Sequence, residues 1–212
     1  MKYKMIRLLF LIFLTLVGVA IYVAFDKKNQ DPSPEISDVA TVVVGKTYGQ
    51  ATIGGPFELV DVNNQPRTQA DFNGKFMIVY FGYSFCPDIC PAALYNMTQA
   101  FSELSEKELN QLAPLFISVD PERDTVENLR IYMQNFHPKI IGLTGTDEQI
   151  NHAKKQYRVY AQKAKPDGTS TDYLIDHSSI VYLMDRRGRF ITSFNHQTDP
   201  ETIIKVIRSA LS

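Results

Sequence analysis

The pattern of apolar and polar residues divides the chain into an N-terminal apolar run, a short polar stretch and a long alternation of strands and helices. Residues 8–25 form an unbroken stretch without a charge. Its length lies near the lower limit for a helix that crosses about 30 Å of hydrocarbon. Lys2, Lys4 and Arg7 precede the run and give its N-terminal side a positive excess. That excess predicts a cytoplasmic N-terminus and export of everything that follows.

We interpret residues 1–25 as a retained membrane anchor. A cleaved signal peptide is the alternative, because Gly18-Val19-Ala20 has the small residues of a cleavage site. The apolar run, however, continues for five residues beyond Ala20. Residues 26–44 include a polar stretch with two prolines and are predicted to be a linker. Residues 45–212 are then the folded domain.

The folded part alternates buried strands with amphipathic helices. Strands are predicted at 75–81, 115–119, 140–143, 180–184 and 189–194, and helices at 91–111, 125–136, 147–158 and 200–211. A further hairpin is predicted at 57–60, with Asn63-Asn64 as its turn. A polar segment with Pro166 and Gly168, at 163–172, is predicted to be a loop. This order predicts an α/β fold, with a central mixed sheet flanked by helices.

Composition narrows the possible functions. Hydrophobic residues make up 44% and charged residues 21% of the chain, which excludes general disorder. The formal net charge of −1 provides no overall basic field that would attract nucleic acid. The two cysteines, Cys86 and Cys90, are too few for a disulfide-stapled scaffold or a four-cysteine zinc site.

Both cysteines lie in the loop that follows the first predicted buried strand, at 82–91. Open α/β sheets place their sites at the carboxyl ends of strands, so this location favours a functional role. Pro91 suits the first position of a helix, which predicts Cys90 as the N-cap and both thiols near the helix N-terminus. That position favours the thiolate form. A structural disulfide, a redox dithiol and a metal site are all compatible with the pair, and a metal would need a further ligand.

The four histidines are the candidates for that ligand. His137, His152 and His196 lie in polar surroundings that indicate solvated positions. His177 directly precedes the strand at 180–184, whose start packs opposite the cysteine loop in a thioredoxin-like topology. His177 is therefore a candidate ligand, and a buried imidazole with a structural role is the alternative.

Three stretches resemble motifs of the SCO/SenC family of copper-binding, thioredoxin-like proteins. They are the cysteine loop at 82–91, the stretch from Val119 to Thr125, and Asp176-His177-Ser178 with the residues that follow to 190. The resemblance extends from about residue 45 to the C-terminus. Ser84 departs mildly from the family pattern, which usually has threonine there.

The resemblance implies that Cys86, Cys90 and His177 bind one copper ion, as Cu(I) or Cu(II), in a thioredoxin-like copper-binding domain. Asp120 is the expected auxiliary group beside the site, and a turn-capping aspartate is the alternative. Arg123 and Asp124 are expected to pair locally rather than to contact copper.

The resemblance also implies a function. The protein would be a copper metallochaperone, rather than an enzyme, that assists assembly of the binuclear copper site in cytochrome c oxidase subunit II. The alternative is a thiol–disulfide reductase that acts on the cysteines of that subunit; nothing in the sequence favours peroxide reduction. Expected partners are subunit II, other copper chaperones or thiol reductants, and the membrane, with no nucleic acid. The expected location is the inner membrane, with the domain in the periplasm or the mitochondrial intermembrane space.

Overall fold

The computed structural model describes residues 52–164 and 173–212. The predicted anchor at 1–25 and the predicted linker at 26–44 lie outside the described residues, as does most of the predicted loop at 163–172. Among the helices that the structure describes, none is both long and apolar enough to cross a membrane.

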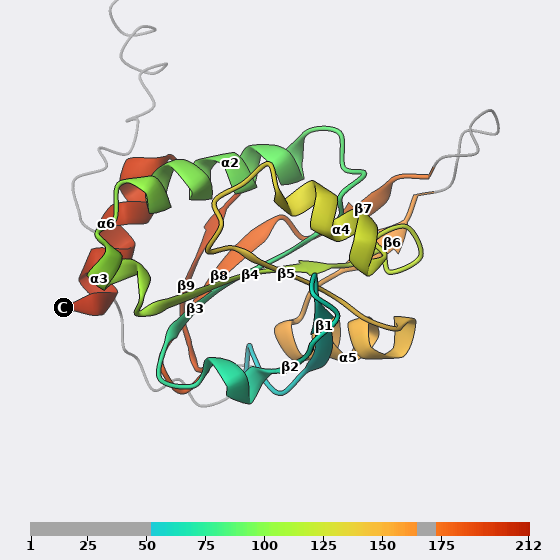
Figure 1. Cartoon of the computed structure of the whole chain (residues 1–212), viewed down its shortest axis with the longest axis horizontal. Helices are drawn as coiled ribbons and strands as arrows, with labels where there is room; N and C mark the ends of the chain where they lie inside the picture. Colours follow the sequence, from blue (N-terminus) through green and yellow to red (C-terminus); the bar gives the residue numbers. More distant parts are fainter. Residues whose placement is uncertain (1–51, 165–172) are drawn as a thin grey trace, which may run out of the picture. The chain divides into compact units, whose positions relative to one another are not determined.

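A seven-stranded mixed sheet forms the centre of the domain, in the order β2-β1-β5-β4-β3-β8-β9 (Figure 1). Its strands are β1 (Glu58–Asp61), β2 (Pro66–Thr68), β3 (Phe76–Gly82), β4 (Leu112–Ser118), β5 (Ile141–Thr144), β8 (Ile180–Met184) and β9 (Phe190–Asn195). The helices are the 3-10 helix η1 (Gln69–Phe72), α2 (Ile89–Ser102), α3 (Glu106–Leu109), α4 (Val126–Met133), α5 (Asp147–Tyr157) and α6 (Pro200–Leu211). A separate two-stranded ribbon joins β6 (Ala161–Lys163) to β7 (Ile175–His177).

The central strands β3 and β4 are buried along their whole length. Their nearly continuous apolar sequences suit strands that are covered on both faces. β3 pairs in parallel with β4 and antiparallel with β8. The predicted mixed sheet is therefore confirmed, and β3 lies inside it, between β4 and β8.

Helices cover both faces of this sheet. The chain passes from β3 to β4 and on to β5 in one direction across the sheet, so right-handed crossovers place α2 and α4 on the same face. α5 lies on the opposite face (Figure 1). Gly142 on β5 permits close approach of α4, because a Cβ at that position would lie 2.7 Å from Cγ of Met133.

The prediction of one helix at 91–111 is wrong in two respects: the helix begins earlier, and it is interrupted. It consists of α2 and α3, separated at Ser105, whose side chain accepts a hydrogen bond from the Glu108 N–H in a capping box that starts a new helix. Asp88, and not Cys90, occupies the N-cap position of α2. Pro91 is the third helical residue, and its missing N–H costs nothing in the first turn, where no intrahelical acceptor exists.

β4 begins three residues earlier than predicted, with Pro114 inside it. The Gln111 carbonyl and the Val119 N–H form main-chain hydrogen bonds with residues at the two ends of β3. Main-chain groups alternate in direction along a strand, so odd-numbered residues of β4 bond toward β3 and Pro114 faces β5. Pairing with β5 begins only at Leu115. The missing proline N–H therefore interrupts no ladder.

The ribbon of β6 and β7 is a further difference from the sequence prediction, which had only a loop before His177. His177 is the last residue of β7 and pairs with Ala161. The ribbon therefore brings the histidine to its position on a strand.

Candidate metal centre

The two cysteines lie where β3 gives way to α2. Cys90 is fully buried, and Cys86 is partly exposed. The backbone N–H of Cys90 donates to Sγ of Cys86 at 3.4 Å, so the first turn of α2 faces that sulfur. A Cβ on Gly82 would lie 2.9 Å from Sγ of Cys90. Glycine at the end of β3 therefore leaves the space that this sulfur occupies.

His177 approaches the cysteines from the ribbon. Its Nε2 lies 3.3 Å from Sγ of Cys90. Its Nδ1 lies 3.2 Å from the carbonyl oxygen of Ser178. When a metal is bound, an Nδ1–H that donates to this carbonyl would leave the Nε2 lone pair free for the metal, which is the tautomer that a metal ligand needs.

Tyr83 supports both the imidazole and its strand. The two rings of Tyr83 and His177 meet edge to face, with centroids 5.7 Å apart. The Tyr83 hydroxyl accepts a hydrogen bond from the Ile175 N–H at 3.2 Å. Sequence reasoning missed this residue, because an aromatic residue after a buried strand is typical of a core position.

The ligand atoms of Cys86, Cys90 and His177 all lie within 4.8 Å of one another. Over 52–164 and 173–212, this is the only such group of three histidine, cysteine or acidic side chains. Two sulfurs and one imidazole suit the softer transition metals. The Tyr80 hydroxyl is buried and has no hydrogen-bond partner among the described residues. Burial and the neighbouring Cys90 raise the pKa of Tyr80, which keeps its hydroxyl a donor. An anionic, metal-bound sulfur of Cys90 would be an acceptor for it.

The two thiols differ in acidity. Hydrogen bonding from the Cys90 thiol, assisted by His177 and by backbone N–H groups, holds the pKa of Cys86 well below its ordinary value, although burial opposes this. The hydrogen bond to Cys86, together with burial, raises the pKa of Cys90. The hydrogen bond between the two sulfurs therefore favours the charged form of Cys86 and the neutral form of Cys90.

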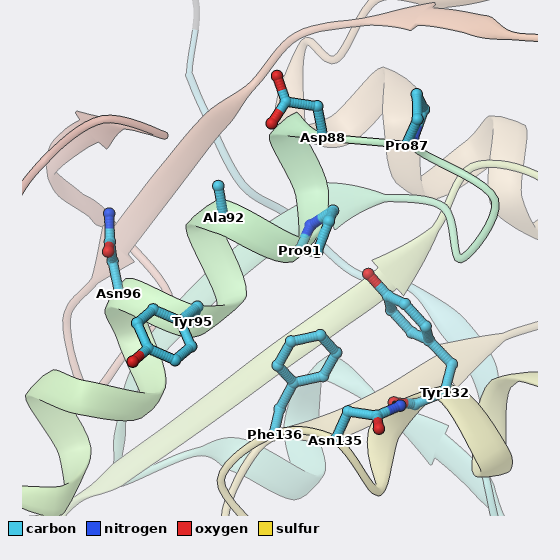
Figure 2. A pocket seen from close by; sticks show the side chains of 9 residues that line it. All are labelled: Pro87, Asp88, Pro91, Ala92, Tyr95, Asn96, Tyr132, Asn135 and Phe136. Atoms are coloured by element: carbon cyan, nitrogen blue, oxygen red, sulfur yellow. The ribbon is translucent and has the colours of Figure 1, made fainter.

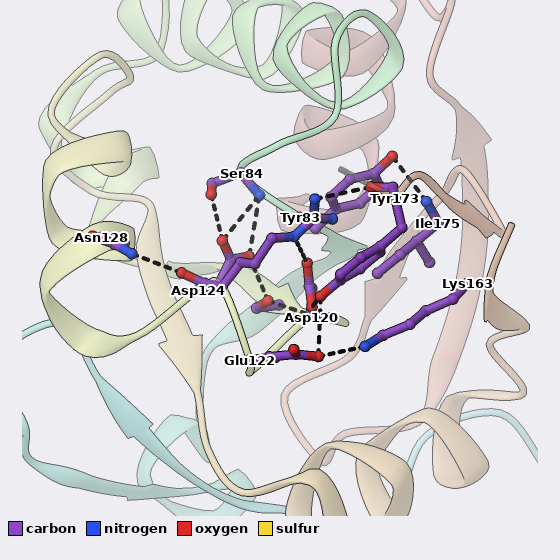
Figure 3. Close-up of polar contacts among 11 residues, drawn as sticks. Tyr83, Ser84, Asp120, Glu122, Asp124, Asn128, Lys163, Tyr173 and Ile175 are labelled. Carbon is purple, nitrogen blue, oxygen red and sulfur yellow. Dashed lines mark hydrogen bonds and ion pairs between the residues drawn. The ribbon is translucent and has the colours of Figure 1, made fainter. Parts of the chain in front are cut away.

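The motif from Val119 to Thr125 lies beside this group, and its polar contacts appear in Figure 3. The buried Asp120 carboxylate accepts hydrogen bonds from Nε of Arg123 at 2.5 Å and from the Tyr173 hydroxyl at 2.7 Å. Asp120 does not belong to the group of three ligand residues. Its role as an auxiliary group stays a prediction.

The expected pairing of Arg123 with Asp124 is wrong. Arg123 forms its ion pair with Asp120. Asp124 instead accepts hydrogen bonds from the backbone and hydroxyl of Ser84 and from the Ser118 hydroxyl. Burial raises the pKa of Asp124, and these hydrogen bonds oppose the rise. Asp124 therefore anchors the start of the cysteine loop to the end of β4.

The other histidines lie outside the metal-ligand group, as expected. His152 is exposed, and His137 and His196 are partly exposed. Burial lowers the pKa of His137, whose Nδ1 accepts a hydrogen bond from the Lys139 N–H. None of the three joins the group formed by the cysteines and His177.

Comparison with known proteins gives a consistent result. The SCO1/SenC family model matches residues 45–212. Mitochondrial SCO2 of Saccharomyces cerevisiae is 44% identical over 166 residues, which cover 78% of this chain and 55% of that protein. The mitochondrial SCO1 homolog 1 of Arabidopsis thaliana is 40% identical over 203 residues, 94% of this chain and 60% of that protein. The chain thus spans little more than half the length of these relatives.

A solved structure shares the fold. Bradyrhizobium japonicum ScoI, determined with copper bound, superposes with a TM-score of 0.69 at 38% identity. The match covers 74% of this chain and 99% of that one. The central mixed sheet with its flanking helices is therefore the thioredoxin-like fold of Sco proteins.

Proposed function

The chain belongs to the SCO1/SenC family, and from this premise we propose that it is a copper metallochaperone. It binds one copper ion through Cys86, Cys90 and His177 and assists assembly of the binuclear copper site in cytochrome c oxidase subunit II. The observation that carries the proposal is the convergence of the three ligand atoms within 4.8 Å. The copper bound to the similar ScoI supports copper as the metal.

The donor set suits a metal that must be both held and released. Two thiolates and an imidazole bind Cu(I) well, since soft sulfur donors match that ion. Three donors leave room for a ligand of the receiving protein, so copper can pass by stepwise exchange. Cys86 is the less buried member of the cysteine pair, so a partner would reach it before Cys90.

The surface beside the cysteine loop offers space for a partner. An open hollow between α2 and α4 begins at Pro87 and Pro91 and continues along Tyr95 and Tyr132 (Figure 2). Phe85, directly before Cys86, is half-exposed. Partly apolar surface next to a transfer site is suited to transient docking.

The location follows from the predicted anchor. Residues 1–25 hold the protein in the inner membrane with its N-terminus in the cytoplasm, and the copper-binding domain lies in the periplasm. In a mitochondrion the same orientation places the domain in the intermembrane space, and two of the relatives are mitochondrial proteins. The proposed partners on that side are subunit II and other copper chaperones or thiol reductants.

A transfer experiment tests the delivery step. The full chain, purified in mild detergent and loaded with Cu(I), is mixed with the reduced, copper-free soluble domain of subunit II. Oxidation afterwards develops the visible absorption of a binuclear copper site in proportion to the copper transferred. We expect the loaded chain to fill that site faster than a chelator-buffered copper solution at the same free Cu(I). Equal rates would contradict a chaperone role.

Thiol–disulfide reduction of subunit II is the second candidate function. It is favoured by the adjacency of the two free thiols, since a mixed disulfide on the accessible Cys86 would be resolved by Cys90. This chemistry does not require His177. If reduction dominates, the His177→Ala variant will still reduce oxidised subunit II, although it no longer transfers copper.

A further inference from the structure

The proposed function gives no role to Arg123, although this residue lies within the second family-like motif. Its guanidinium is surrounded by aromatic rings from two different segments. Cζ of Arg123 lies 3.7 Å from the ring centroid of Tyr173 and 4.7 Å from that of Phe85. Phe85 directly precedes Cys86, and Tyr173 lies four residues before His177 in the segment that leads into β7.

Hydrogen bonds fix the orientation of this guanidinium. Nε donates to the carboxylate of Asp120 at 2.5 Å, and Nη1 donates to the carbonyl oxygen of Tyr173 at 2.9 Å. The Tyr173 hydroxyl donates to the same carboxylate at 2.7 Å. Arg123, Asp120 and Tyr173 therefore form a closed set of contacts.

Burial makes these contacts strong. The side chain of Arg123 is 15% exposed, and that of Asp120 is 1% exposed. Nη2 of Arg123 is buried without a hydrogen-bond partner among the described residues. Contact with the aromatic rings therefore offsets most of the cost of removing this part of the cation from water. Cation–π attraction increases when the cation is desolvated in this way.

We propose that Arg123 is a positioning residue for the metal centre. It joins the cysteine loop, through Phe85, to the His177-bearing segment, through the ring and carbonyl of Tyr173. The three ligand atoms are thereby assembled before copper arrives. This inference rests on the proposed copper site and adds to it a residue that contacts none of the ligand atoms.

Lysine should not replace Arg123 in this role. The guanidinium is planar, donates along two fixed directions and stacks on a ring face at the same time. An ammonium group is a compact charge that cannot bond to Asp120 and the Tyr173 carbonyl while it also lies close to both rings. The positioning role therefore predicts that Arg123→Lys behaves like a neutral substitution, although it conserves the charge.

The test measures Cu(I) affinity of the full chain by competition with a chromophoric chelator under reducing conditions. The variants are Arg123→Gln, Arg123→Lys and the matched control Arg130→Gln, whose arginine is exposed and paired with Glu127 on α4. Arg123→Gln is made in the wild-type and the His177→Ala backgrounds. Thermal unfolding of each variant confirms that it is folded.

We expect Arg123→Gln to weaken Cu(I) binding about 10- to 30-fold, because it removes both the cation–π contacts and the charged hydrogen bonds of a desolvated guanidinium. Arg123→Lys should lose nearly as much, and Arg130→Gln should bind as the wild type does. In the His177→Ala background, Arg123→Gln should change affinity by less than about threefold, because there is no imidazole left to align. Phe85→Leu, which leaves Arg123 in place, should show a smaller loss with the same dependence on His177.

Two results would overturn the inference while leaving the proposed function intact. One is a wild-type affinity for Arg123→Gln, which would mean that the loop and the ribbon align without it. The other is an equal loss in both backgrounds, which would assign Arg123 to general stability or to the cysteines alone. An absence of any effect of His177→Ala would instead overturn the proposed three-ligand site, and the inference with it.

Discussion

The three ligand residues reach one point through different local contacts. Cys90 is buried in the first turn of α2, and Cys86 accepts the N–H of that turn. His177 lies between the Ser178 carbonyl and the ring of Tyr83. Each contact restricts the rotamers of a ligand side chain before the metal binds. Less conformational entropy is then lost on binding than if the side chain lay in a flexible loop.

Gly82 provides a test of this arrangement at the scale of one residue. A Cβ there would lie 2.7 Å from Cε2 of Phe116 and 2.9 Å from Sγ of Cys90. We expect Gly82→Ala to displace Cys90, to lower the free energy of unfolding by about 1–3 kcal/mol, and to weaken Cu(I) binding without removing a ligand. Chemical denaturation and chelator competition measure the two effects.

Gly145→Ala is the matched control for this substitution. The nearest atom to its added Cβ is Oε1 of Gln149, at 2.7 Å, and none of the three nearest atoms belongs to a proposed ligand residue. This variant should bind Cu(I) as the wild type does. Unchanged copper affinity in Gly82→Ala would mean that the space beside Cys90 is not critical for the ligand arrangement.

At the scale of elements, the sequence predicted the central strands and the capped helices well, because their signals are local. β3 carries a continuous apolar run, and α4 and α6, which lie within the helices predicted at 125–136 and 200–211, are capped by the side chains of Thr125 and Asp199. The start of α2 was misplaced because Pro91 suits several positions of a first turn. The break at Ser105 had a readable signal, a serine followed three residues later by Glu108.

The ribbon had no comparable signal. β6 and β7 are three residues each, too short for a period-two pattern to stand out. Their pairing depends on contacts that are remote in sequence, such as the Ile175 N–H donating to the Tyr83 hydroxyl. Sequence reasoning therefore identified His177 but not the strand that carries it.

The hairpin of β1 and β2 gives a prediction about pH. Burial alone would raise the pKa of Asp61, but hydrogen bonds from the backbone of Gln65 and Asn63 and from Arg67 outweigh it and lower that pKa below the ordinary 3.8. Asp61 therefore contributes stability that is present above its unfolded pKa and lost as the pH falls through its lower folded pKa.

Asp61→Asn should accordingly lower the free energy of unfolding by about 1–3 kcal/mol at neutral pH. The difference from the wild type should shrink as the pH falls through the lowered folded pKa of Asp61, because the wild-type carboxylate then becomes protonated as well. Urea denaturation across this range measures the effect. Glu58→Gln, an exposed change in the same hairpin, is the control. A difference that is constant with pH would show that the charge of Asp61 is unimportant.

At the scale of the whole molecule, the sheet brings segments that are distant in sequence together at the ends of its internal strands. Cys90 and His177 are 87 residues apart in sequence, and they meet because β8 pairs antiparallel with β3. Composition and periodicity predicted an α/β sheet but could not predict this pairing, since strand order is not encoded in local pattern. A thioredoxin-like topology made His177 a candidate opposite the cysteine loop, and the family resemblance added its expected role as a copper ligand.

The predicted anchor is tested on the whole chain. We expect the full chain to stay in the membrane fraction after an alkaline wash, because its apolar segment is long enough to span the bilayer. A chain that lacks residues 1–25 should be released, and N-terminal sequencing should find the segment intact in the mature full chain. Recovery of a mature protein that begins after Ala20 would instead favour a cleaved signal peptide.

The central claim is that Cys86, Cys90 and His177 together hold one copper ion. Its most direct test is Cu(I) titration of the reduced full chain against a chromophoric chelator, with wild type, His177→Ala and the exposed-histidine control His152→Ala. The account predicts one Cu(I) per chain, an affinity loss greater than about tenfold in His177→Ala, and none in His152→Ala. Equal affinity of wild type and His177→Ala would contradict the three-ligand site.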